Sequence, residues 1–98
     1  MILIVDDEAP IRRLLRLNLE RVGYQVIEAE SGPVACQLLR DSVTKIDLVV
    51  TDQNMPEMNG TELESWIRQQ EAFRELPVLV LKGGATNLVE AIRRSHLP

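Results

Sequence analysis

Ile2-Leu3-Ile4-Val5-Asp6-Asp7-Glu8 and Leu48-Val49-Val50-Thr51-Asp52 decide the fold, because each is an apolar run that ends in acidic residues. An apolar stretch of four or more residues is typical of a strand buried on both faces, as in parallel sheets. Carboxylates that follow such strands lie at the carboxyl edge of the sheet, where open α/β folds bind their ligands. Acids brought together there repel one another unless a cation neutralises them. The pattern therefore predicts a site for a hard divalent metal ion and one reactive carboxylate.

The composition is that of one soluble globular domain. The chain has 98 residues, of which 45% are hydrophobic and 27% charged, and we expect a single domain over residues 1–98. A net charge of −4 argues against direct nucleic-acid binding. No apolar run is long enough to cross a membrane, so we expect no membrane contact. A single cysteine, Cys36, cannot form an internal disulfide, which favours a cytoplasmic location.

Strand and helix patterns alternate along the chain. The first helical pattern lies between Pro10 and Gly23, and its apolar positions include Leu14, Leu15 and Leu19. The same spacing predicts helices from Ser31 to about Asp41, after Gly60 and after Thr86, and apolar runs predict strands at 2–5, 24–27, 47–51 and 78–81.

These elements predict a three-layer α/β sandwich around a parallel sheet with strand order 2-1-3-4. βαβ crossovers are right-handed, so if the third strand lies on the other side of the first, the first helix covers one face and the second and third helices cover the other. We place the last helix beside the first, which gives two helices on each face. The first and third strands are then neighbours at the switch point of the sheet, and this brings Asp6, Asp7 and Asp52 together.

Two stretches resemble the receiver domain of two-component response regulators. Residues 4–8 read Ile-Val-Asp-Asp-Glu, and residues 48–60 read Leu-Val-Val-Thr-Asp-Gln-Asn-Met-Pro-Glu-Met-Asn-Gly. The shared features are an acidic pair after the first strand, an Asp after the third, and a Met-Pro-x-Met-x-Gly loop. The similarity runs from Met1 to about Leu81. It implies a flavodoxin-like fold and a phosphoacceptor that takes its phosphoryl group from a histidine kinase or phosphotransfer protein.

The resemblance also implies roles for individual residues. Asp52 matches the phosphoacceptor, and Asp6 and Asp7 match the acids that bind Mg²⁺ together with Asp52. Asn54 matches the position whose backbone carbonyl is a further metal ligand. Lys82, at the end of the last predicted strand, is expected to pair its ammonium with the phosphoryl group. Such a chain is not a conventional enzyme, since it catalyses only its own aspartyl phosphorylation and dephosphorylation.

The C-terminal part departs from the family. A usual receiver has five strands and five helices, whereas this sequence predicts four of each. The hydroxyl residue after the fourth strand, the aromatic switch residue and the proline after Lys82 are absent. One explanation is internal loss of a strand–helix unit of roughly 20 residues. The other is truncation after the fourth helix, with Lys82 in place of the hydroxyl residue. We favour the internal loss.

The same features leave two alternative functions to consider and also predict a homodimer. The shortened chain could act as a non-switching receiver-like interaction module. A Mg²⁺-dependent phosphohydrolase is disfavoured, because that class has a second Asp two residues after its nucleophile and Asn54 stands there. The apolar strand at 78–81 has no outer neighbour in the sequence, which predicts a homodimer through this edge or by exchange of the last helix. Arg12, Arg13 and Arg16 are expected to form the solvated face of the first helix.

Overall fold

The computed structural model describes residues 1–41 and 45–81. Its elements alternate between strand and helix, as the sequence predicted, and a short 3₁₀ turn, η1, precedes the last strand. The predicted last helix and Lys82 lie outside the described residues. In chain order the elements are β1 (Ile2–Val5), α1 (Ala9–Arg21), β2 (Val26–Ala29), α2 (Gly32–Asp41), β3 (Leu48–Asp52), α3 (Gly60–Gln69), η1 (Glu71–Phe73) and β4 (Val78–Leu81).

The four strands form one parallel sheet in the order β2-β1-β3-β4, which confirms the predicted order. In the register of the two central strands, Val5 at the end of β1 lies opposite Thr51 of β3. On the other side of β1, Val5 lies opposite Ala29 of β2. The carboxyl ends of β1 and β3 are therefore level with each other, and the residues that follow them share one edge of the sheet.

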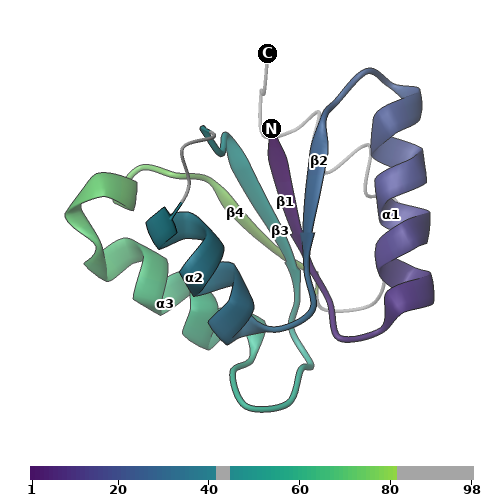
Figure 1. Cartoon of the computed structure of the whole chain (residues 1–98). Coiled ribbons are helices and arrows are strands. Elements are labelled where there is room, and N and C mark those ends of the chain that lie inside the picture. Colours follow the sequence, from purple (N-terminus) through teal and green to yellow (C-terminus); the bar gives the residue numbers. More distant parts are fainter. Residues whose placement is uncertain (42–44, 82–98) are drawn as a thin grey trace.

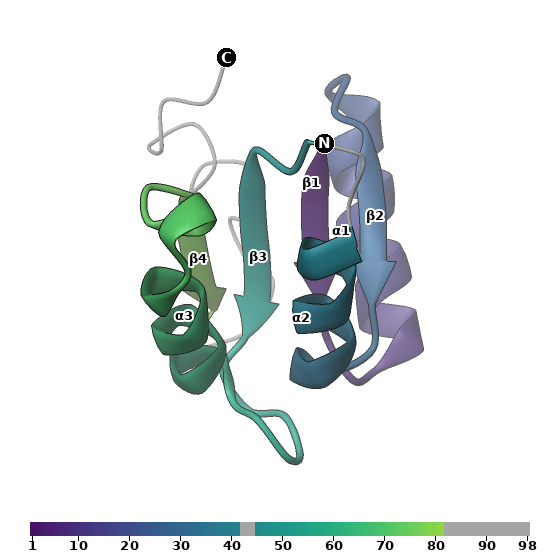
Figure 2. The ribbon, with the colours of Figure 1, turned by 60° about the vertical axis from the view of Figure 1, so that its left-hand side comes forward.

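The helices form layers on both faces of the sheet (Figure 1). α1 contacts β1 and β2 on one face, where Leu15 and Leu19 pack against Ile2, Ile4 and Val50. Figure 2 shows α2 and α3 in front of the opposite face, which carries a second apolar cluster that includes Leu3, Val49, Leu39 and Ile67. The predicted placement of the first three helices is confirmed. Among the described residues, none of the helices combines the length and the apolar character needed to cross a membrane.

The start of α3 is fixed by reciprocal capping. The side chain of Asn59 accepts a hydrogen bond from the backbone N–H of Glu62 at 2.8 Å. The side chain of Glu62 in turn accepts one from the backbone N–H of Asn59 at 3.0 Å. Such caps stabilise a helix by about 1 kcal/mol. The loop between Asp52 and α3 therefore has a firmly anchored end.

Gly60 is needed where this loop meets β3, and its replacement by alanine is expected to destabilise the fold. A Cβ at this position would lie 2.6 Å from the backbone carbonyl oxygen of Asp52 and 2.9 Å from Cγ1 of Val80. Because the nearest atom belongs to the backbone, the clash requires the loop to shift. We expect Gly60→Ala to lower the free energy of unfolding by about 2 kcal/mol, measured by urea denaturation. Ser65→Ala, an exposed position of the same helix, is the control and is expected to change it by less than about 0.5 kcal/mol.

Candidate functional site

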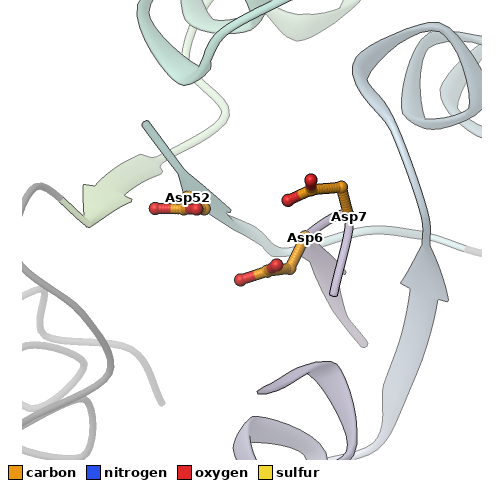
Figure 3. Close-up of side chains that lie close together, drawn as sticks. All are labelled: Asp6, Asp7 and Asp52. Atoms are coloured by element: carbon orange, nitrogen blue, oxygen red, sulfur yellow. The ribbon is translucent and has the colours of Figure 1, made fainter. Parts of the chain in front are cut away.

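Three carboxylates meet at the carboxyl edge of the sheet (Figure 3). Asp6 and Asp7 directly follow β1, and Asp52 is the last residue of β3. Each offers one carboxylate oxygen, and these atoms all lie within 4.8 Å of one another. Asp6 is buried, with 5% of its surface exposed, whereas Asp52 is half-buried and Asp7 is exposed. The structure thus brings together the three acids that the sequence predicted to converge.

Among residues 1–41 and 45–81, little positive charge compensates the carboxylates of this group. Burial raises the pKa of Asp6 above its ordinary value, and the negative charges of Asp52, Asp7 and Glu8 raise it further. The backbone N–H of Glu8, which donates to Oδ1 of Asp6 at 2.9 Å, opposes this rise of the pKa. In the part of the chain that the structure describes, no ion pair involves the three carboxylates. A cluster of hard oxygen donors with unbalanced negative charge fits a divalent cation such as Mg²⁺.

The backbone around Asp52 is held from several sides. The hydroxyl of Thr51 donates to the carbonyl oxygen of Asp52 at 2.9 Å. The backbone N–H of the next residue, Gln53, donates a hydrogen bond to the carbonyl oxygen of Leu81 in β4 at 3.2 Å. The carbonyl oxygen of Gln53 accepts a hydrogen bond from the backbone N–H of Gly60 at 3.0 Å. Its side-chain oxygen also accepts hydrogen bonds from the backbone and the hydroxyl of Thr61 at 2.9 and 2.8 Å. The backbone that carries the Asp52 carboxylate is therefore preorganised rather than free to reorient.

The other two predicted site residues are Asn54, as a metal ligand, and Lys82, as a counter-charge. Asn54 is exposed and lies two residues beyond Asp52, at the start of the loop that leads to α3. Its backbone carbonyl stays a prediction as a metal ligand. Lys82 lies outside the described residues, so its role as a counter-charge also stays a prediction.

The contact of Arg12 with the backbone of Asp6 was not predicted from the sequence. Nη1 of Arg12 donates to the backbone carbonyl oxygen of Asp6 at 2.7 Å, and its Nε donates to Oε1 of Glu28 in β2 at 3.2 Å. Only 16% of its side chain is exposed, so the predicted solvated face is wrong for Arg12. Hydrogen bonds from Arg16 and then from Arg12 hold the pKa of Glu28 below its ordinary value, against the effect of burial. Glu28, a charged residue within β2, was the feature of the sequence that could have indicated a buried partner for an arginine.

A hollow on the surface lies at the opposite edge of the sheet. It is lined by apolar residues that include Leu39, Phe73 and Leu76, with Arg40 and Lys45 among its charged residues. Part of this lining directly precedes β3 and β4, whereas the acids follow β1 and end β3. The hollow shares no residue with the carboxylate group, so the acids define the candidate site.

Known proteins resemble this chain over nearly its whole length. The family model described as "Response regulator receiver domain" matches residues 2–95. Chemotaxis protein CheY1 of Helicobacter pylori is 37% identical over 95 residues, which cover 94% of this chain and 76% of that protein. The phosphate regulon transcriptional regulatory protein PhoB of Pseudomonas aeruginosa is 37% identical over 93 residues, which are 93% of this chain but 40% of that protein.

Solved structures agree with these relatives. The response regulator protein TrrA of Thermotoga maritima, determined in complex with Mg(2+)-BeF, superposes with a TM-score of 0.73 at 28% identity. The superposition covers 95% of this chain and 96% of that chain. With its acids at the ends of β1 and β3, its parallel sheet in flavodoxin-like order and a family match over residues 2–95, the chain belongs to the response regulator receiver domain family.

Proposed function

We propose that Asp52 is the residue on which this receiver domain accepts a phosphoryl group. Receiver domains of the CheY type are phosphoacceptors of two-component signalling, are generally non-enzymatic, and interact with histidine kinases or phosphotransfer proteins. The observation that carries the proposal is the position of the Asp52 carboxylate, at the end of β3 and within 4.8 Å of Asp6 and Asp7. It is half-buried rather than enclosed, so a phosphodonor can reach it.

The metal of this reaction would be held by Asp6, Asp7, Asp52 and the backbone carbonyl of Asn54. Mg²⁺ prefers oxygen ligands and keeps several waters, which suits a small set of carboxylates with one carbonyl. When bound, it neutralises the negative charge that develops on the transferring phosphoryl group. The burial of Asp6, together with the negative charges of Asp52 and Asp7 beside it, supports this assignment.

The transfer itself requires one nucleophile from the chain. A carboxylate oxygen of Asp52 attacks the phosphorus of a phosphohistidine, and a new P–O bond forms as the P–N bond breaks. The electron pair of the broken bond stays on the histidine nitrogen, and the product on the receiver is an acyl phosphate. Attack of water on that phosphorus later releases inorganic phosphate and restores the carboxylate. The ammonium of Lys82 is the proposed counter-charge for the phosphorylated state.

Intact-mass spectrometry after incubation with Mg²⁺ and acetyl phosphate tests this proposal. We expect the mass to increase by one phosphoryl group, the increase to map to Asp52, and chelation of the metal to prevent it. A second readout is the amide NMR spectrum with beryllofluoride and Mg²⁺, in which signals around Asp52 are expected to shift. If the chain incorporates no phosphoryl group and its amide spectrum does not change with beryllofluoride, the non-switching interaction module is the better description.

We also propose that the chain forms a homodimer. β4 is an edge strand among the described residues, and its four residues, Val78–Leu81, are all apolar and half-exposed. The other edge strand, β2, carries Glu28, which is held by two arginines. An uncharged apolar edge favours pairing with a second copy, and exchange of the last helix is the alternative route. Sedimentation velocity over a concentration series is expected to show a dimer, and a monomer at the highest concentration would contradict both routes.

The cellular location and the extent of the domain stay predictions from composition. The single buried cysteine supports a reducing compartment such as the cytoplasm. The short connections between the described elements support one domain over residues 1–98.

A further inference from the structure

We propose that Arg12 is a positioning residue that sets Asp6 for binding the metal ion, an inference that rests on the proposed function. Arg12 touches no carboxylate of the site and is not a metal ligand. It acts through the backbone of Asp6, to which its guanidinium donates a hydrogen bond of 2.7 Å.

Three hydrogen bonds define the position of Asp6. Its backbone N–H donates to the carbonyl oxygen of Ala29 at 3.2 Å, and its Oδ1 accepts from the N–H of Glu8 at 2.9 Å. Its own carbonyl oxygen accepts from Arg12. The first of these bonds joins the backbones of two neighbouring segments, and the second closes a local turn between the Asp6 side chain and the Glu8 backbone. In residues 1–41 and 45–81, the bond from Arg12 is the one through which a side chain fixes the Asp6 backbone.

Glu28 anchors the guanidinium in this position. It lies in β2 opposite Ile4 of β1 and accepts from Nε of Arg12 at 3.2 Å. The guanidinium thus joins the first turns of α1, the middle of β2 and the end of β1. Two different nitrogens of the planar guanidinium donate to these two acceptors, a fixed geometry that the single ammonium nitrogen of lysine does not reproduce. Because the side chain is mostly buried, solvent competes little with these bonds.

Geometry and charge predict opposite effects for the loss of Arg12. A guanidinium next to a cation site repels the cation, so if its charge were all that mattered, its removal would tighten Mg²⁺ binding. Glu28, however, balances the charge of Arg12. The remaining effect of Arg12 is to position Asp6, so removing Arg12 is expected to weaken Mg²⁺ binding. Residues that orient metal ligands by hydrogen bonds typically account for about 10- to 100-fold in metal affinity.

The experiment compares Arg12→Gln with Arg16→Gln in the full chain. Arg16 pairs with the same Glu28 at 2.8 Å and also with Glu20, but it is not bonded to Asp6. Both variants remove one positive charge from the same network. Titration with MgCl₂, followed by calorimetry or by amide NMR, is expected to show affinity about tenfold weaker for Arg12→Gln. Arg16→Gln is expected to stay within about twofold of the unchanged chain, and Arg12→Lys is expected to lie between the two.

A kinetic split separates positioning from a general loss of structure. With acetyl phosphate as donor, Arg12→Gln is expected to need about ten times more Mg²⁺ for half-maximal phosphorylation. Its rate at saturating Mg²⁺ is expected to stay within about twofold. Thermal unfolding of each variant sets a working temperature at which all are folded.

Two results would overturn the inference. One is equal or tighter Mg²⁺ binding by Arg12→Gln, and the other is equal weakening by Arg12→Gln and Arg16→Gln. Failure of the unchanged chain to bind Mg²⁺ or to take up phosphate would instead contradict the proposed function, so the two failures are distinguishable.

Discussion

Replacing Asp52 by asparagine is expected to abolish phosphoryl incorporation, with a fall of more than about a thousandfold in its rate. The amide keeps the size of the side chain but offers no anionic oxygen to attack phosphorus. Asp52→Glu keeps the nucleophile and moves it by one methylene, and misplacement on the scale of 1 Å costs about 100-fold. We therefore expect a weak but measurable signal from the glutamate variant. Intact-mass spectrometry with acetyl phosphate and Mg²⁺ measures all three chains side by side.

The matched control is Glu64→Gln, which removes a carboxylate from the surface of α3. Its incorporation rate is expected to stay within about twofold of the unchanged chain. If Asp52→Asn is labelled at the rate of this control, then Asp52 is not the phosphoacceptor.

Replacing Asp6 by asparagine is expected to separate stability from metal binding. Without metal at neutral pH, the folded chain is expected to gain about 1 kcal/mol, because a buried charge that faces Asp52 and Asp7 is removed. The amide oxygen can still accept the hydrogen bond from Glu8. The same change removes an anionic ligand, so Mg²⁺ binding is expected to weaken by more than about tenfold. Urea denaturation with and without MgCl₂ measures both effects.

The pH dependence of this gain has a defined sign. The pKa of Asp6 is raised in the folded chain, so the folded state holds the proton more tightly than the unfolded state. In metal-free buffer, Asp6 therefore lowers the stability of the fold as pH rises through the unfolded and then the folded pKa. The difference between Asp6→Asn and the unchanged chain should be largest at neutral pH and vanish below the ordinary pKa of Asp.

Mg²⁺ should reverse the order of the two chains. At a free concentration 100 times the dissociation constant of the unchanged chain, it stabilises that chain by about 2.7 kcal/mol and a tenfold weaker Asp6→Asn by about 1.4 kcal/mol, a difference larger than the variant's gain of about 1 kcal/mol without metal. An asparagine variant that is less stable without metal at neutral pH, or that gains equally from Mg²⁺, would contradict the assignment of Asp6.

Much of the fold was predictable because the two central strands are unusually clear in sequence. Residues 2–5 and 48–51 are apolar runs that end in acidic residues. Once the third strand is placed beside the first, right-handed crossovers determine which face each helix covers. The same rule placed α2 and α3 on the face opposite α1. Since parallel strands end at one edge, the convergence of Asp6, Asp7 and Asp52 followed from the topology alone.

The errors concern side chains whose surroundings depend on distant residues. Leu14 fits the apolar spacing of α1, yet it is 49% exposed. The described part of the chain places α1 against β1 and β2, where Leu15 and Leu19 form the buried stripe. Arg12 has the spacing of a surface residue, but its guanidinium is hydrogen-bonded to Glu28 of β2 and to the carbonyl oxygen of Asp6 after β1. No periodic pattern encodes that contact, because it depends on the position of a strand that begins beyond the helix. The C-terminal part, including Lys82, lies outside the described residues, so its shortening stays a prediction.

The most direct test of the account is a titration of the ¹⁵N-labelled chain with MgCl₂, followed by amide NMR. We expect saturable shifts for Asp6, Asp7 and Asp52, with little change at Leu76 on the opposite edge of the sheet. Saturation at one ion per chain would agree with a site that joins the ends of β1 and β3. An unchanged spectrum at these three residues, or shifts that rise without saturation across the acidic surface, would contradict it.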